Sequence, residues 1–270
     1  YGDHRDLHLS LRRQRQMCIR DSVEDLKDGR AFASVAKRVS KTKPVVVLKA
    51  GRTSLGAKAA NSHTGALAGD DRVYDAVLRQ SGVVRAKSLN DMLEFARGLA
   101  VLPTPKGENV LILTGAGGSG VLLSDACVDN DLSLMAMPSD LDAAFREYIP
   151  PFGAAGNPVD ITGGEPPTTY RATIDLALRD QRIHSLVLGY WHTIITPPMV
   201  FAELLGEAVS NARADGNDKP VVCSLVGDVE IEQAAEYLMD RNILAYPYTA
   251  EKPVAVLGAK YRWARNAGLI

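Results

Sequence analysis

The amino-acid sequence predicts an α/β protein with two doubly wound domains, each a parallel sheet covered by helices. Short apolar runs of strand length alternate with segments whose apolar residues recur at helical spacing, which indicates strands joined by crossover helices. The alternation occurs twice, because two prolines and a glycine within 103–107 separate one series from the next. Two glycine-rich loops follow expected strands, at the edge where doubly wound sheets bind ligands.

In the first series, a helix is expected over 28–39 and a strand buried on both faces at 45–48. Gly51, Gly56 and the small residues between them predict a loop that leads to His63. The remaining elements are expected at 70–81 (helix), 83–84 (strand) and 88–102 (helix). This series is expected to be the back half of a domain.

The second series has five expected strands with helices between them, the pattern of a flavodoxin-like domain. The strands are expected at 109–113, 133–137, 185–189, 220–225 and 243–246. The helices are expected at 118–130, 140–148, 168–178, 199–213, 230–241 and 251–263. The expected domains are therefore 23–104, which is incomplete, and 105–270.

Composition excludes several classes of protein. The formal net charge of −1 over 270 residues gives no basic excess for binding nucleic acid or an anionic membrane. No apolar run reaches the roughly 18 residues of a transmembrane helix. The three cysteines, Cys18, Cys127 and Cys223, lie far apart without metal-ligand spacing, and we expect no secretory signal. We expect a cytoplasmic protein without a metal site of its own, in which Cys127 and Cys223 belong to the core.

Residues 1–22 differ from the rest of the chain, being basic and without apolar periodicity. One interpretation is a basic arm or transit peptide. Another is that they resemble the translation of a sequencing adapter, and we favour this one. The segment is then not native, and the natural N-terminal part of the protein is expected to be missing.

His63 is the first candidate for chemistry. It lies among small residues, with Ser62 before it and Thr64 and Gly65 after it, so the imidazole is left uncovered and is surrounded by hydroxyl and backbone N–H groups. These surroundings suit a histidine that carries a phosphoryl group, with Ser62, Thr64 and Gly65 contacting the phosphate. A histidine that only makes hydrogen bonds within a loop fits the same residues.

The segment 114–120 is the second candidate, because its glycines lie between an expected strand and a helix. Glycines and a helix N-terminus bind phosphate through backbone N–H groups, here those of Gly117, Gly118, Ser119 and Gly120. The pattern also matches a dinucleotide-binding fingerprint, but residues 136–138, at the end of the next strand, contain no acidic residue. A turn needed only for close packing of strand and helix is a further alternative.

A second glycine-bearing loop, 156–164, places Asn157 and Asp160 where they could contact a substrate or ligand. As a plain turn, the loop would need no function. Of the two remaining histidines after residue 22, His184 is expected to be structural, and His192 could line a pocket at the end of a strand.

Five blocks of sequence, in this order and spacing, resemble the acyl-CoA synthetases that form a nucleoside diphosphate. This superfamily contains the ADP-forming acetate–CoA ligases and succinyl-CoA synthetase. The blocks are 24–30, 43–52, 62–69, 115–120 and 157–160, and the resemblance extends over essentially all of 23–270. It implies two succinyl-CoA synthetase-like domains of the flavodoxin-like type.

The resemblance implies that His63 is the residue that becomes phosphorylated and that Glu24 holds its other ring nitrogen. It also implies CoA, ATP or ADP, and Mg²⁺ as cofactors, bound mainly by domains outside this chain. An ATP-grasp subunit or fused domain is the implied partner, within a hetero-oligomer or a longer chain. The acid substrate and the choice between ADP and GDP are not predicted.

Two other classes of function stay open at this point. The chain could be the ligase-like regulatory segment of a protein acetyltransferase, or a flavodoxin-like binding module without catalysis. The presence of both His63 and Glu24 favours the ligase over the regulatory segment. We expect the isolated chain to be inactive.

Overall fold

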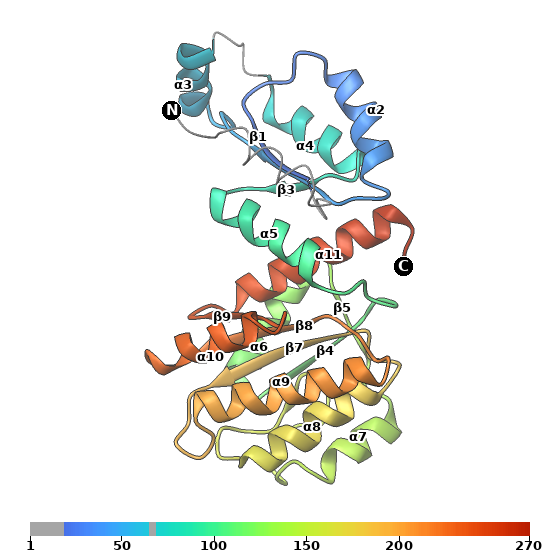
Figure 1. Cartoon of the computed structure of the whole chain (residues 1–270), viewed down its shortest axis with the longest axis vertical. Coiled ribbons are helices and arrows are strands. Elements are labelled where there is room, and N and C mark those ends of the chain that lie inside the picture. Colours follow the sequence, from blue (N-terminus) through green and yellow to red (C-terminus); the bar gives the residue numbers. More distant parts are fainter. Residues whose placement is uncertain (1–18, 65–68) are drawn as a thin grey trace, which may run out of the picture. The chain divides into compact units, whose positions relative to one another are not determined.

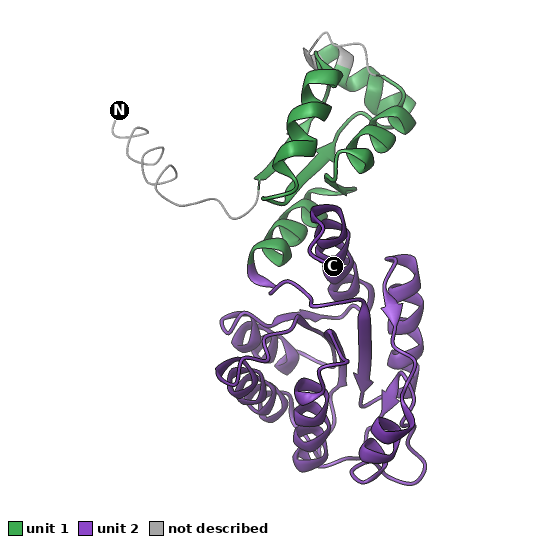
Figure 2. Cartoon of the chain, turned by 90° about the vertical axis from the view of Figure 1, so that its right-hand side faces the viewer, with its two compact units in different colours: residues 1–100 green, residues 101–270 purple. Residues whose placement is uncertain are grey.

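The computed structural model describes residues 19–64 and 69–270, which form two compact units. The first unit comprises residues 1–100 and the second residues 101–270, as Figure 2 shows. Each unit contains its own parallel sheet, so the predicted α/β class is confirmed. Among the described residues, no helix is long and apolar enough to span a membrane.

The sheet of the first unit has the order β1-β2-β3, and all its pairs are parallel. Its strands are β1 (Ile19–Val23), β2 (Val45–Lys49) and β3 (Val84–Ala86). Its helices are α2 (Gly29–Val39), α3 (Ser54–Thr64), α4 (Asp71–Gln80) and α5 (Leu89–Val101). A small apolar core joins the sheet to α2 and α4, with Val45, Val47 and Leu78 at its centre.

Strand β1 includes residues 19–22, which the sequence analysis had set apart together with residues 1–18. In the structure they pair with β2, and Ile19 lies opposite Val45 in the register. The side chains of 19–22 are nevertheless exposed. The pairing therefore rests on backbone hydrogen bonds, which any sequence can form. The origin of this segment stays a prediction.

The loop predicted to lead from Gly51 to His63 is present only over 51–53, because the residues from Ser54 to Thr64 form helix α3. The small residues misled the prediction, since alanine and lysine favour a helix although they give it no apolar face. Thr53 caps the helix by accepting a hydrogen bond from the backbone N–H of Gly56, at 3.1 Å. Gly51, at φ +68°, supplies the turn before the helix.

The second sheet has the order β5-β4-β7-β8-β9, with β6 also paired to β4, and all these pairs are parallel. Its strands are β4 (Asn109–Thr114), β5 (Ser133–Leu134), β6 (Val159–Asp160), β7 (Ser185–Trp191), β8 (Val221–Val226) and β9 (Leu244–Pro247). Without β6, the order is the 2-1-3-4-5 order of flavodoxin-like domains, as predicted. The predicted strand at 133–137 is shorter than expected, and β6 was not predicted.

Helices cover both faces of this sheet (Figure 1). They are α6 (Gly117–Asp129), α7 (Ser139–Arg146), α8 (Pro167–Arg179), α9 (Pro198–Ala214), α10 (Glu230–Met239) and α11 (Glu251–Ala267). Helices α8, α9 and α10 pack side by side, and α6 packs against α11. Cys127 and Cys223 are fully buried, which confirms their assignment to the core.

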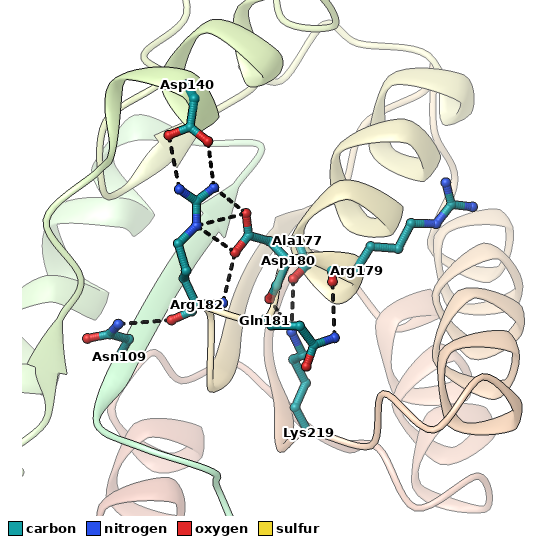
Figure 3. A network of polar contacts seen from close by, with 8 residues as sticks. All are labelled: Asn109, Asp140, Ala177, Arg179, Asp180, Gln181, Arg182 and Lys219. Atoms are coloured by element: carbon teal, nitrogen blue, oxygen red, sulfur yellow. Dashed lines mark hydrogen bonds and ion pairs between the residues drawn. The ribbon is translucent and has the colours of Figure 1, made fainter.

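Polar side chains hold the elements together at the amino ends of the strands of this second sheet (Figure 3). The Arg182 guanidinium donates to both oxygens of Asp140, at 3.0 and 2.9 Å, and to the Asp180 carboxylate. The Lys219 ammonium donates to the carbonyl oxygens of Ala177 and Asp180, at 3.3 and 2.8 Å, and so caps the end of α8. His184 accepts a hydrogen bond from the backbone N–H of Asn109 through Nδ1, at 3.0 Å, which confirms its structural role.

Candidate functional site

In the first unit, the predicted phosphate-carrying segment lies at the end of α3. His63 and Thr64 are the last two residues of this helix, and Gly65 lies outside the described residues. Ser62 is exposed, and its hydroxyl donates to the Lys58 carbonyl one turn earlier, at 3.0 Å. The Ser62 oxygen can still accept a hydrogen bond, but its own proton is already used within the helix.

Glu24 follows the last residue of β1 and is partly buried at the carboxyl end of the first sheet. Its neighbour Asp25 accepts a hydrogen bond from the hydroxyl of Tyr74 on α4, at 2.5 Å, which is the main cause of the lowered pKa of Asp25. Lys49, the last residue of β2, lies at the same end of the sheet and is only 3% exposed. This part of the sheet edge therefore combines carboxylates with a buried cation.

The sequence analysis missed Lys49, Tyr74 and Asp25. A signal for Lys49 was present, because it directly follows an apolar run that was correctly predicted as a buried strand. A lysine at the carboxyl end of such a strand is placed at the edge where ligands bind. Tyr74 lies within the helix expected over 70–81, and nothing in its local sequence indicates the bond to Asp25.

In the second unit, the glycine-led start of α6 is open to solvent at its first two residues. Gly117 and Gly118 are exposed, and no side chain among the described residues caps this helix. The first three N–H groups of a helix have no partner within it, so those of residues 117–119 are available to an anion. The N–H of Gly120 is not, because it donates to the Ala116 carbonyl at 3.1 Å.

The residues of this segment differ in how far they are exposed to solvent. Ser119 is 3% exposed, and its hydroxyl lies against Gly189 in the interior, so only its backbone can contact a ligand. Gly120 is buried, and a Cβ there would lie 3.1 Å from Thr114 and 3.3 Å from Pro158, so a larger residue would require these side chains to shift. Of the four residues of this segment predicted to bind phosphate, Gly117 and Gly118 are therefore the exposed ones.

Asp160 ends β6 and lies beside the start of α6. One carboxylate oxygen, Oδ1, accepts from the backbone N–H of Thr162 at 2.9 Å. The other, Oδ2, lies 2.7 Å from the position that a Cβ on Gly117 would occupy. The structure thus brings two predicted site residues, Asp160 and Gly117, next to each other at the carboxyl end of the second sheet.

The side chain of Asn157 has a structural role, because it forms hydrogen bonds with the backbone. Its Oδ1 accepts from the Ile112 N–H at 3.0 Å, and its Nδ2 donates to the carbonyl oxygens of Val110 and Met135, at 2.8 and 3.0 Å. Both amide hydrogens are used, so a ligand could reach only the second lone pair of the carbonyl oxygen. A ligand-binding role for Asn157 stays a prediction.

Tyr170, on α8, is a buried residue that the sequence analysis did not single out. It is 1% exposed, and its hydroxyl has no hydrogen-bond partner among the described residues. The hydroxyl oxygen lies 2.0 Å from the position of a Cβ added to Gly115, so only glycine fits there. Burial raises the pKa of Tyr170 strongly, so it remains a neutral phenol.

His192 lies at the carboxyl end of β7 between two acidic side chains. Its Nδ1 is 3.3 Å from Asp228 Oδ1 and its Nε2 is 3.6 Å from Glu230 Oε2. Within the described part of the chain, these three residues form a group that could hold a metal ion. Each ring nitrogen faces a different carboxylate, however, and both carboxylates are mostly exposed. This arrangement is that of an imidazole between two acids rather than a formed coordination shell.

Two known families match the chain, one for each unit. A succinyl-CoA ligase like flavodoxin domain matches residues 8–99, and a Ligase-CoA domain matches residues 110–270. Acetate–CoA ligase [ADP-forming] I subunit alpha of Pyrococcus furiosus is 42% identical over 243 residues, which are 90% of this chain and 52% of that protein. The 4-hydroxybutyrate–CoA ligase [ADP-forming] of Nitrosopumilus maritimus is 34% identical over 249 residues, 90% of this chain and 34% of that one.

A solved structure agrees with these relatives. The dinucleotide forming acetyl-coenzyme A synthetase 1 of Ca. Korarchaeum cryptofilum, in complex with phosphate and ADP, superimposes with a TM-score of 0.88 at 35% identity. The match covers 99% of this chain and 57% of that chain. The chain therefore spans about half the length of the alpha subunit and of the solved chain that it matches.

Proposed function

The chain belongs to the NDP-forming acyl-CoA synthetases, the family of the ADP-forming acetate–CoA ligases, and we propose that it carries the phosphohistidine of such an enzyme. The reaction is the reversible conversion of acyl-CoA, ADP and phosphate into a free acid, CoA and ATP. The observation that carries this proposal is the match of both units, in chain order, to two ligase domains. The proposed cellular location is the cytoplasm.

The phosphoryl group moves in three steps. Acyl-CoA and inorganic phosphate first give an acyl phosphate and free CoA. A neutral ring nitrogen of His63 then attacks the phosphorus atom, so that an N–P bond forms while the P–O bond to the acid breaks and the acid leaves as a carboxylate. A terminal oxygen of ADP finally attacks the phosphorus, which gives ATP and regenerates neutral His63.

Glu24 has the role of fixing the ring. Its carboxylate accepts a hydrogen bond from the N–H of the ring nitrogen that is not phosphorylated, which selects the tautomer and offsets the positive charge of the phosphorylated imidazole. The position of Glu24 directly after β1 supports this role, because the carboxyl ends of parallel strands are where doubly wound folds bind ligands. Ser62, Thr64 and Gly65 flank the ring as proposed phosphate contacts.

The start of α6 has the role of stabilising negative charge on the transferred group. The N–H groups of Gly117, Gly118 and Ser119 and the positive end of the helix dipole are available for this, and the lack of a side-chain cap from the described part of the chain supports it. Asp160, beside Gly117, is proposed to contact the substrate or its phosphate, as Asn157 is through its remaining lone pair.

CoA, the nucleotide and Mg²⁺ are assigned to other parts of the enzyme, because this chain spans only about half of its relatives. We therefore propose an ATP-grasp subunit or fused domain as partner, in a hetero-oligomer or a longer chain. Mg²⁺ bound with the nucleotide supplies charge neutralisation during transfer to ADP. The chain alone is expected to show no turnover.

Labelling tests the proposal. The complete natural protein, together with its ATP-grasp partner, is incubated with γ-labelled ATP and Mg²⁺. We expect label on the subunit that contains His63, lost in acid and retained in alkali, and at least 100-fold less label with His63→Ala. Glu24→Gln should slow labelling about 10-fold or more, which is about 1.4 kcal/mol of barrier.

Two outcomes would overturn the proposal. Label that persists after His63→Ala would place the phosphoryl group on another residue, and an acid-stable adduct would exclude a phosphohistidine. Arg182→Ala serves as the control, because Arg182 lies at the amino end of the second sheet and should leave labelling unchanged.

A further inference from the structure

The start of α6 has free donors with a free acceptor beside them. The N–H groups of residues 117–119 have no partner within the helix, and no side chain of the described residues caps them. Asp160 lies next to Gly117, but its carboxylate does not bond to these N–H groups. Its Oδ1 accepts from the Thr162 N–H at 2.9 Å, and its Oδ2 accepts no hydrogen bond and forms no ion pair within the described part of the chain.

A bare carboxylate at an anion site restricts the kind of anion that can bind. The oxygen atoms of an ionised carboxylate only accept hydrogen bonds. A fully deprotonated oxyanion also offers only acceptors, so it would meet Asp160 Oδ2 with like charge and without a hydrogen bond. An oxyanion that keeps a proton has a hydroxyl that can donate to Oδ2, and hydrogen bonds to an ionised acceptor are strong. Inorganic phosphate keeps a proton at neutral pH, whereas sulfate does not.

Tyr170 is an independent indication that a ligand completes this site. It is 1% exposed, and its hydroxyl has no hydrogen-bond partner among the described residues. A buried hydroxyl without a partner costs about 1–3 kcal/mol, which a phenylalanine of the same shape would avoid. The hydroxyl lies against Gly115, two residues before Gly117. An unused donor at this place therefore indicates a hydrogen-bond acceptor that comes from a ligand.

Glycines adjoin the Tyr170 hydroxyl on the side of the site. It contacts Gly115, and the carbonyl oxygen of Gly115 lies 3.3 Å from the position that a Cβ on the exposed Gly163 would occupy. Neither glycine has a side chain to cover the hydroxyl, so a displacement of this backbone would open it to a ligand. Burial raises the pKa of Tyr170 strongly, so the hydroxyl donates as a neutral phenol.

We propose that the start of α6 selects phosphate that carries a proton: the N–H groups of residues 117–119 and the Tyr170 hydroxyl donate to its oxygens, and Asp160 Oδ2 accepts a hydrogen bond from its hydroxyl. This inference rests on the proposed function, because it names the form of phosphate that this site takes. A site built to pair with a hydroxyl of its ligand discriminates strongly against an analogue that lacks this hydroxyl. Sulfate is such an analogue, with the same tetrahedral shape.

The test compares the binding of phosphate and of sulfate. The complete natural protein with its ATP-grasp partner, free of nucleotide, is dialysed at pH 7 and constant ionic strength against labelled inorganic phosphate, with sulfate as competitor. We expect phosphate to bind at least about 10-fold more tightly than sulfate. Asp160→Asn can keep the bond from Thr162 through Oδ1 but places an amide donor where Oδ2 was. It should bind phosphate about 10-fold more weakly and sulfate about 3-fold more tightly, a gain that structural damage would not produce.

Two pairs of variants separate this proposal from general effects. Tyr170→Phe should weaken both anions about 3-fold without changing the preference. Its control is Tyr261→Phe, which removes a buried hydroxyl bonded to Ser185 at 2.8 Å and should change neither affinity. Asp125→Asn is the control for charge, because it removes the same charge from an exposed position further along α6 and should leave the preference intact.

The outcomes decide the proposal separately from the proposed function. A preference for phosphate that is the same in wild type and in Asp160→Asn overturns it, as does a wild-type protein that binds no phosphate. Circular dichroism shows whether Asp160→Asn folds; if it does not, unchanged affinities in Tyr170→Phe overturn the proposal instead. If the preference behaves as expected but His63 is not labelled by ATP, only the phosphohistidine is overturned.

Discussion

The two ends of the second sheet use polar groups in opposite ways. At the amino end, Arg182 and Lys219 are bonded to carboxylates and to helix carbonyls (Figure 3). At the carboxyl end, the start of α6 has no side-chain cap, and the Tyr170 hydroxyl is buried without a partner among the described residues. Thr162, beside them, adopts a left-handed backbone conformation with φ +65°.

This difference separates stability from function within one domain. Bonded polar groups at the amino end hold helix α8 and the strands together, so their loss should lower stability alone. Unused donors and close glycine contacts at the carboxyl end stabilise little, and they are what a ligand site needs. The predictions below test this division, beginning with the largest expected effect.

Gly115→Ala should have the largest effect, because its new methyl group would lie 2.0 Å from the Tyr170 hydroxyl in a closely packed interior. We expect a loss of about 3 kcal/mol in the free energy of unfolding of the second unit. Urea unfolding followed by tryptophan fluorescence measures this, since both tryptophans, Trp191 and Trp263, lie in that unit.

A double-mutant cycle with Tyr170→Phe identifies the cause. Tyr170→Phe alone should be neutral or slightly stabilising, because it removes a buried hydroxyl that has no partner among the described residues. In the double variant, most of the loss should disappear, although the ring carbon at 3.0 Å remains close. A loss from Gly115→Ala that is the same with and without the hydroxyl would contradict this account.

Gly117→Ala and Gly118→Ala form a matched pair at the start of α6. Both positions are exposed, and an alanine in a helix usually stabilises by about 0.4–1 kcal/mol relative to glycine. A Cβ on Gly118 meets no described atom within 4 Å, whereas a Cβ on Gly117 meets Asp160 Oδ2 at 2.7 Å. We expect the Gly117→Ala variant to be less stable than Gly118→Ala by about 1–2 kcal/mol.

The same urea titration compares the two variants. Asp160→Ala should remove the difference between them, since the carboxylate is its cause. Equal stabilities of the two single variants would show that Asp160 is not fixed beside Gly117, and the hydrogen bond from the Thr162 N–H would then not hold it.

Helices and strands could be predicted well from the sequence, whereas the roles of individual side chains could be predicted less well. Alternation of apolar runs and helices predicted the parallel, flavodoxin-like class of the second domain, because such patterns follow directly from which faces are buried. The helix before His63 was missed, since a helix of small residues has no apolar stripe to reveal it. Strand β5 is shorter than predicted, and β6 was not predicted, because apolar segments this short do not define a strand by their pattern.

Site residues were harder to predict because their tasks depend on partners distant in sequence. Asn157 was expected at a ligand, but its amide bridges Val110, Ile112 and Met135, which lie 22 to 47 positions away in the chain. The bond between Tyr74 and Asp25 spans 49 positions. A motif identifies the residues that take part in chemistry, whereas these bonds are made only by the folded chain.

Replacing Lys219 should have the smallest effect, which appears as a change in how the free energy of unfolding depends on pH. Burial lowers the pKa of Lys219 from 10.5 to about 8. Between these values the unfolded chain holds a proton that the folded chain has lost, so this lysine makes the free energy of unfolding rise with pH above about 8. Lys219→Met removes this contribution. Above pH 8, the free energy of unfolding of the wild-type protein should therefore rise relative to that of the variant, by up to about 1.4 kcal/mol per pH unit.

Urea unfolding at pH 7, 8, 9 and 9.5 measures this difference. Taking the difference between the two proteins matters, because burial raises the pKa of the Cys127 thiol to about 12, which lowers stability above pH 9 in both alike. Lys260→Met is the matched control, since burial lowers the pKa of Lys260 to about 8 as well. It should show a similar slope without removing the cap of α8. Parallel curves for wild type and Lys219→Met would mean that water reaches Lys219. The amino end of the sheet would then owe its stability to Arg182 and its two carboxylates rather than to a buried ammonium.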